Sequence, residues 1–131
     1  MAVDIVIEVE NKPGELAKLA AAVSDAGVNL AAATFTGTGD AAQLHILVKH
    51  AEPVRHALAI THADIHPVER EVVVVDMGDN PALLGDLARE IADAGVNIDT
   101  VYVATNNRVV FHSTDMDGLR AALGAHATHL H

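Results

Sequence analysis

The chain carries nine histidines, and they are the residues whose chemistry stands out first. Imidazole is the commonest ligand of transition metals, and its charge changes close to neutral pH. Three histidines form a His-x-x-His-x-His pattern in the last residues of the sequence, namely His126, His129 and His131. This spacing permits a metal site, so a metal-binding protein is one alternative. Because the sequence has no cysteine, we favour a solvated tail and expect no metal.

The sequence lacks the patterns that are typical of catalytic sites. Its only two serines, Ser24 and Ser113, do not lie in a Gly-x-Ser-x-Gly elbow, and there is no glycine-rich phosphate loop. The absence of cysteine also excludes a thiolate nucleophile and a disulfide framework. We therefore expect no enzymatic activity and no cofactor.

The charge balance excludes one class of partner. The chain has 18 acidic and 8 basic residues, a formal net charge of −10 with neutral histidines. Nucleic-acid binding depends on Lys and Arg that displace counterions, so we expect no nucleic-acid partner. Asp4 stands where a signal peptide has basic residues, and no apolar run approaches the length of a membrane span. We expect a soluble, cytoplasmic protein without a membrane partner.

An internal repeat organises these residues. Nine of the twenty positions in residues 11–30 are identical to the residue 68 positions later in the chain. The identical pairs are Pro13 and Pro81, Leu16 and Leu84, Leu19 and Leu87, Ala20 and Ala88, Asp25 and Asp93, Ala26 and Ala94, Gly27 and Gly95, Val28 and Val96, and Asn29 and Asn97. A repeat of this kind fixes the architecture, and it predicts two similar units, residues 1–68 and 69–131.

Each unit has the same predicted order of elements. Apolar residues alternate with acids in residues 3–10, as in a strand with one buried face, and Leu16, Leu19, Ala20 and Val23 form one helical stripe. Further strands are predicted at residues 29–36, 43–49 and 64–69 with a helix at 53–60, and in the second copy at 97–104 and 108–112 with a helix at 116–123. The order βαββαβ predicts an α+β, ferredoxin-like unit with an antiparallel sheet and its helices on one face.

The last strand of each unit differs from the others. Pro67 cannot donate a backbone hydrogen bond, so we place the strand at residues 64–69 at a sheet edge. In the second unit few residues follow position 123, and the final strand there is predicted to be short or missing.

The second unit is also predicted to have an apolar outer sheet face. Val72 and Val74 lie on the predicted outer face, and we expect Val101, Val103 and Val110 to share it. An apolar face of this size is seldom left in water, so we expect a partner chain to cover it, most simply in a homodimer. The alternative is that the connection at residues 64–69 or the C-terminal tail covers it.

The repeated segments resemble a known family. Asn-Lys-Pro-Gly-Glu-Leu is followed after a helix by Asp-Ala-Gly-Val-Asn-Leu, and Asp-Asn-Pro-Ala-Leu-Leu is followed by Asp-Ala-Gly-Val-Asn-Ile. In their strand–turn–helix–strand context, these segments resemble the ACT domain, and the whole chain resembles a small tandem ACT protein. The resemblance implies two units side by side, joined through their second strands, with ligand pockets between them.

The resemblance also implies where a ligand binds. In ACT domains an amino acid or related metabolite lies by the turn after the first strand and by the start of the second strand. The corresponding residues are Asn11, Lys12, Pro13, Gly14, Leu16, Asn29 and Leu30 in the first unit, and Asp79, Asn80, Pro81, Ala82, Leu84, Asn97 and Ile98 in the second. The start of a helix attracts a carboxylate, and an Asn side chain can bind an amino or amide group.

The second copy departs from the family pattern at one position. Ala82 stands where the family has Gly, and its Cβ restricts the approach of a ligand, which favours the first copy as the binding unit. Asp79 favours the second copy, because its carboxylate attracts an ammonium group. We expect a regulatory sensor that acts through association, with a regulatory subunit docked on a biosynthetic enzyme as the alternative.

Overall fold

A computed structural model describes residues 2–62 and 64–128 of the chain. It divides into two compact units, an N-terminal unit of Val3–Arg70 and a C-terminal unit that begins at Glu71. Each unit has its own sheet and its own hydrophobic core.

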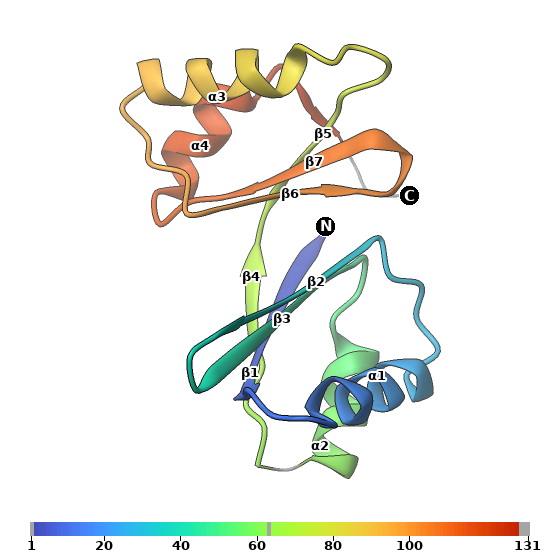
Figure 1. Ribbon diagram of the computed structural model, residues 1–131. Helices are drawn as coiled ribbons and strands as arrows, with labels where there is room; N and C mark the ends of the chain where they lie inside the picture. Colours follow the sequence, from blue (N-terminus) through green and yellow to red (C-terminus); the bar gives the residue numbers. More distant parts are fainter. Residues whose placement is uncertain (1, 63, 129–131) are drawn as a thin grey trace. The chain divides into compact units, whose positions relative to one another are not determined.

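The N-terminal unit has the order strand, helix, strand, strand, helix, strand. Its elements are β1 (Val3–Glu10), α1 (Glu15–Asp25), β2 (Ala32–Thr38), β3 (Ala41–Val48), α2 (Glu52–Thr61) and β4 (Val68–Glu71). The sheet has the order β2-β3-β1-β4, with β3 antiparallel to both β1 and β2. Figure 1 shows α1 and α2 on the same face of this sheet, which leaves β2 and β4 as its edges.

Alternation along β1 explains how this sheet meets its helices. Ile5 and Ile7 point to the helical side, where they are fully buried against Leu19 of α1 and Leu58 of α2. Burying a side chain of this size contributes about 1.5–3 kcal/mol. The helices therefore hold the ends of β1 and the turn after it in fixed positions.

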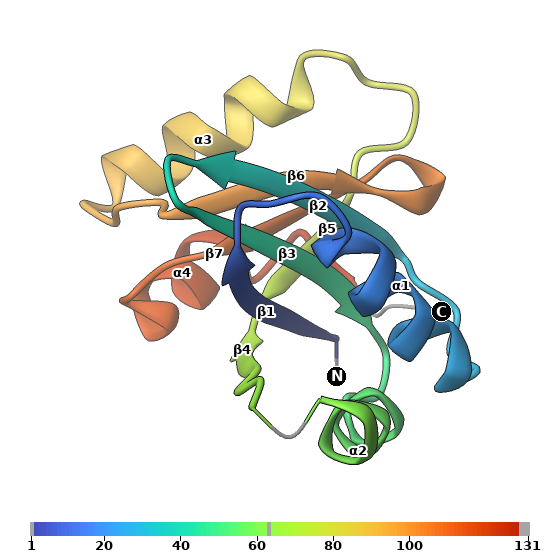
Figure 2. The same cartoon turned by 60° about the horizontal axis from the view of Figure 1, so that its bottom comes forward.

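The C-terminal unit repeats this arrangement. Its elements are β5 (Val73–Asp76), α3 (Leu83–Asp93), β6 (Thr100–Ala104), a 3-10 turn at Thr105–Asn107, β7 (Arg108–His112), α4 (Met116–Leu123) and β8 (Ala127–Thr128). The sheet has the order β6-β7-β5-β8, and α3 and α4 lie on one face of it (Figure 1), over a core that contains fully buried Phe111. Figure 2 shows the same elements in a second view. These observations confirm the predicted α+β fold with two ferredoxin-like units.

Three predicted boundaries need correction. β2 and β6 begin at Ala32 and Thr100, three residues later than the predicted starts at 29 and 97. The first cross-strand hydrogen bonds come from the N–H groups of Ala31 and Asp99, so both asparagines lie in loops before the strands. The strand predicted at 64–69 begins only after Pro67, whose missing N–H cannot join the ladder.

The predicted outer face is also partly wrong. Val101 pairs with Phe111 and Val103 pairs with Val109, and directly paired residues point to the same side of a sheet. Phe111 and Val109 belong to the core under the helices. Val101 and Val103 therefore lie on the helical side at the edge strand, where they remain 47% and 55% exposed.

Two predictions concern contacts beyond a single unit. The joining of the two units through their second strands stays a prediction, as does the homodimer. None of the helices in residues 2–62 and 64–128 is long and apolar enough to span a membrane.

Candidate functional site

The turn between β1 and α1 presents an open helix start. Gly14 precedes the helix with a φ of 91°, and no side chain accepts a hydrogen bond from the first N–H groups of α1. A side chain at Gly14 would meet no atom within 4 Å, so the space around this residue is open. Because a helix start carries a partial positive charge, this turn can accept a carboxylate.

Asn11 fixes this turn to the hairpin between β2 and β3. Its Nδ2 donates to the carbonyl oxygen of Gly39 over 3.0 Å, and its backbone N–H donates to the carbonyl oxygen of Asp40 over 2.9 Å. A Cβ on Gly37 would collide with the Asn11 amide, so the glycine permits this close packing. Asn11 therefore positions the turn relative to the hairpin.

Lys12 lies in a charged cleft beside the turn. Its Nζ is 3.0 Å from Glu10 and 3.7 Å from Glu15, and the hydrogen bond with Glu10 raises the pKa of Lys12. Lys18 adds a second ion pair to Glu15 at 3.2 Å. The cleft has a volume of about 680 Å³, and His62 lines it beside these residues.

Leu16 and Leu30 come together in a different place, an apolar groove along α1 and the sheet. Its volume is about 240 Å³, and Ala20, Ala33 and Ile46 also line it. Leu16 is 44% exposed and Leu30 is 39% exposed. Both side chains can therefore contact a ligand or another protein surface without any rearrangement of the unit.

The corresponding turn of the C-terminal unit has another conformation. Ala82 has a φ of −85°, and its N–H donates to the Asn80 side chain over 3.1 Å. Asn107 in the β6–β7 turn donates to the carbonyl oxygen of Gly78 and ties the two turns together. The Cβ of Ala82 is thus accommodated by a right-handed backbone, and Asn80 already uses one helix-start N–H. Of the other predicted residues, Leu84 is 38% exposed.

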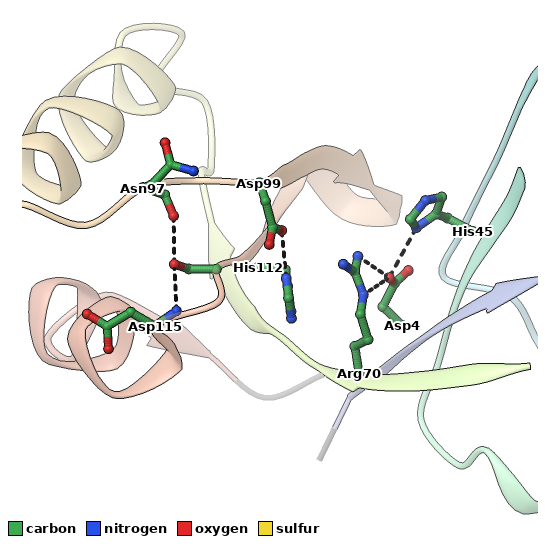
Figure 3. A network of polar contacts seen from close by, with 8 residues as sticks. Asp4, His45, Arg70, Asn97, Asp99, His112 and Asp115 are labelled. Atoms are coloured by element: carbon green, nitrogen blue, oxygen red, sulfur yellow. Dashed lines mark hydrogen bonds and ion pairs between the residues drawn. The ribbon is translucent and has the colours of Figure 1, made fainter. Parts of the chain in front are cut away.

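Asn97 lies in a loop that a buried serine holds. Ser113 Oγ donates to the backbone oxygen of Asn97 over 2.6 Å and accepts a hydrogen bond from the N–H of Asp115 over 3.0 Å (Figure 3). Ile98 packs against the core of the same unit. Ser113 was not among the predicted site residues. Its place directly after a predicted strand and two residues before the capping residue Asp115 could have indicated a structural role for its hydroxyl.

Leu16 and Leu30 line one groove, but the turn after the first strand and the asparagine before the second strand lie at opposite ends of the sheet in each unit. Ala32 at the start of β2 pairs with Leu47, whereas Glu10 before the turn pairs with Ala41 at the hairpin end. Asn29 is therefore separated from Gly14 by the length of the sheet. The same register in β5, β6 and β7 separates Asn97 from residues 79–82.

Two histidine–carboxylate pairs lie outside the predicted site. In the N-terminal unit, Asp4 Oδ2 lies 3.1 Å from His45 Nδ1 and accepts a hydrogen bond from Arg70 Nη2 over 2.8 Å (Figure 3). In the C-terminal unit, His112 Nδ1 lies 2.6 Å from Asp99 Oδ1. Sequence patterns alone do not reveal these pairs, because each joins residues on different strands or loops.

The structure contains no evident metal cluster in the part that it describes. Among residues 2–62 and 64–128, no three His, Asp or Glu side chains are placed to hold one ion. His126 lies 3.3 Å from Glu90, while His129 and His131 lie outside the described residues. The metal-binding tail stays a hypothesis from the sequence.

Comparisons with known proteins agree with this architecture. Residues 3–66 match the family model described as the ACT domain. Among solved structures, protein BT0572 from Bacteroides thetaiotaomicron is 24% identical with a TM-score of 0.81, over 94% of this chain and 86% of that one. The ligand-free regulatory subunit of aspartate kinase from Thermus thermophilus is 21% identical with a TM-score of 0.62, over 95% and 91% of the chains.

A third solved structure is much longer than this chain. Aspartate kinase from Synechocystis is 18% identical with a TM-score of 0.62, and the match covers 95% of this chain but 25% of the enzyme. No curated protein matches the chain. The structural matches show the fold, and the family model identifies the N-terminal half: residues 3–66 form an ACT domain, and the C-terminal unit repeats its architecture.

Proposed function

We propose that this chain is a non-catalytic regulatory protein that binds a small amino acid or a related metabolite. The observation that carries this proposal is the open start of α1 at Gly14, with its positive φ and without a side-chain cap. A carboxylate placed there would accept hydrogen bonds from N–H groups that no side chain satisfies. The exposed leucines of the neighbouring groove would surround the ligand's aliphatic part.

The complete binding site would use residues from two ACT-type units. The turn and the second-strand loop lie at opposite ends of one unit, so one unit cannot close both around a small molecule. Two edge strands that meet about a twofold axis run antiparallel. This pairing would bring Asn97 beside residues 11–14, and Asn29 beside residues 79–82.

The edge strands support this mode of association. β2 and β6 are outer strands of their sheets, the position at which a sheet can extend by a further strand. Beside them the two units expose apolar residues at equivalent positions, Leu16 and Leu84 on the helices. An apolar surface beside an outer strand favours contact with a similar surface, either in the same chain or in a homodimer.

A ligand screen tests the proposal directly. The melting temperature of the purified chain would be measured with each of the common amino acids. A ligand at 100 times its dissociation constant adds about 2.7 kcal/mol to the stability of the folded state, which shifts the melting temperature by several degrees. If none of the amino acids changes the melting temperature, amino-acid sensing is refuted.

Variants then show which residues bind. Asn29→Ala and Asn97→Ala would be measured separately with any amino acid that stabilises the wild-type chain. Gln43→Ala is a matched control, because it also removes an amide, and Gln43 is exposed on β3 outside the groove and both turns. Loss of the ligand-induced shift in one asparagine variant alone would assign the site, whereas unchanged shifts in both would exclude the proposed asparagine contacts.

A second candidate function is that of a regulatory subunit for a biosynthetic enzyme. It is favoured by the fold shared with the regulatory subunit of aspartate kinase from Thermus thermophilus, over 91% of that chain. The test is an aspartate kinase assay with and without this chain, in the presence of the amino acid that binds it. An unchanged rate, with no co-elution of the two proteins, would exclude aspartate kinase as the partner.

A further inference from the structure

The loop before β6 is joined to the start of α4 through one buried hydroxyl. Ser113 is 1% exposed, and its Oγ links the carbonyl of Asn97 to the N–H of Asp115 (Figure 3). Asp115 in turn caps α4, because its Oδ1 accepts a hydrogen bond from the N–H of Gly118 over 2.9 Å. The chain of hydrogen bonds thus runs from the predicted ligand loop to the first turn of a helix.

The N-terminal unit has no equivalent link. Ile5 pairs with Ile46 and Val73 pairs with Phe111, so Phe111 corresponds to Ile46. Two residues further along, Ser113 corresponds to Val48, a buried side chain that cannot form a hydrogen bond. The helix that follows, α2, also has no side-chain cap. The loop of Asn97 is therefore anchored in a way that the loop of Asn29 is not.

We propose that Ser113 is a positioning residue that holds Asn97 for ligand binding and couples the occupied site to α4. This inference rests on the proposed function. A buried hydroxyl that satisfies a carbonyl and an N–H restricts the loop to one conformation, which lowers the entropy that a ligand must remove. The site that contains Asn97 consequently binds more tightly than the site that contains Asn29.

Coupling to α4 follows from the same hydrogen bonds. A ligand that immobilises Asn97 also restrains Ser113 and Asp115, and this stabilises the capped turn of α4. Such coupling is reciprocal, since a more ordered α4 increases ligand affinity by the same factor. The surface of α4 is thus the part of the C-terminal unit where a partner would sense the ligand.

The first test needs no ligand. Amide hydrogen exchange would be compared in the wild type, Ser113→Ala and Asp115→Ala. Ser113→Ala is expected to accelerate exchange about tenfold both at residues 97–99 and at Gly118, because both ends of the link lose their partner. Asp115→Ala removes the cap but retains the N–H that donates to Ser113 Oγ, and Ser113 keeps its hydrogen bond to the Asn97 carbonyl. This variant should therefore accelerate exchange mainly at Gly118, with a smaller effect at residues 97–99. Unchanged exchange at residues 97–99 in Ser113→Ala would overturn the proposal.

The second test measures affinity for the amino acid identified in the melting screen. Ser113→Ala is expected to weaken binding about tenfold at a temperature where all variants are folded. Asp115→Ala, which loses only the cap of α4, should weaken binding by about two- to threefold through the reciprocal coupling. Ser113→Thr keeps the hydroxyl and should restore affinity. Equal losses in Ser113→Ala and Asp115→Ala would reduce Ser113 to a general stabilising residue and overturn its positioning role.

The two proposals fail in different ways. If no amino acid binds the wild-type chain, the proposed function fails, and the binding role of Ser113 fails with it. If the wild type binds an amino acid and Ser113→Ala binds it equally well, the inference about Ser113 alone is overturned. Gln43→Ala, at an exposed residue of β3 in the N-terminal unit, should leave both exchange at residues 97–99 and affinity unchanged.

Discussion

Replacement of Gly14 by Ala should lower the free energy of unfolding by about 1 kcal/mol, although the new methyl group contacts nothing. The φ of Gly14 is 91°, a left-handed conformation in which glycine has no steric cost but other residues do. No heavy atom lies within 4 Å of the position that the methyl group would occupy. The penalty must therefore come from the backbone of the residue itself.

The expected magnitude combines two opposing contributions. An L-residue held in a left-handed conformation loses about 1–2 kcal/mol. Alanine also restricts the unfolded chain, and this stabilises the folded state by about 0.4–1 kcal/mol. The difference is a loss of about 1 kcal/mol, which corresponds to a melting temperature lower by about 4–8 °C for a unit of this size.

Gly85→Ala provides a matched control with the opposite sign. Gly85 lies within α3, its φ is not in the left-handed region, and an added Cβ meets nothing within 4 Å. Because alanine favours a helix over glycine, this variant should be more stable by about 0.5–1 kcal/mol. Both variants would be unfolded in urea and followed by circular dichroism, with unchanged slopes against denaturant.

The comparison has a clear refuting result. The same chemical change, Gly to Ala in open space, is expected to destabilise the protein at position 14 and to stabilise it at position 85. A Gly14→Ala variant as stable as the wild type would show that the turn does not require a left-handed residue. The open helix start that supports ligand binding would then need another geometry.

Three further predictions follow from the packing and the charges. The hydrogen bond from Arg55 lowers the pKa of Glu69 from its ordinary value of 4.5. The pair therefore stabilises the fold above pH 4.5, and this stabilisation is lost as the pH falls through the lowered pKa. The difference in melting temperature between the wild type and Arg55→Ala should consequently become smaller in acid. Leu16→Lys and Leu84→Lys replace exposed side chains, and they should change stability by less than about 0.5 kcal/mol while they reduce self-association in sedimentation equilibrium. Phe111→Ala empties the core of the C-terminal unit and should lower its unfolding free energy by about 3–5 kcal/mol in denaturant titrations.

The repeat and the alternation of β1 were sufficient to predict the fold. Identical residues at one offset predicted two units, and the spacing of Leu16 and Leu19 predicted the first helix. The starts of the second strands were predicted too early, because the sequence Val-Asn-Leu alternates like a strand although its residues form a loop. An alternating sequence indicates which side chains would face the core, but it does not show which backbone groups form hydrogen bonds.

The site was predictable only in part, because its contacts depend on register and on loops. The sequence could not show that Val101 shares a face with Phe111, since a shift of one residue in a strand exchanges the two faces. It also could not show that Asn11 donates to Gly39, or that Asn29 lies at the far end of its unit. These relations join residues far apart in the chain, where no local pattern constrains them.

The link between turn and hairpin has reversed its direction between the two repeats. In the N-terminal unit the amide belongs to the turn, as Asn11 donates to Gly39 of the hairpin, whereas in the C-terminal unit Asn107 of the hairpin donates to Gly78 of the turn. A chimera that combined the first turn with the second hairpin would bring two amides together, and the opposite chimera would have none. The halves of this protein are therefore related as copies but cannot be exchanged piece by piece, and a recombined unit must inherit its turn and its hairpin from the same parent.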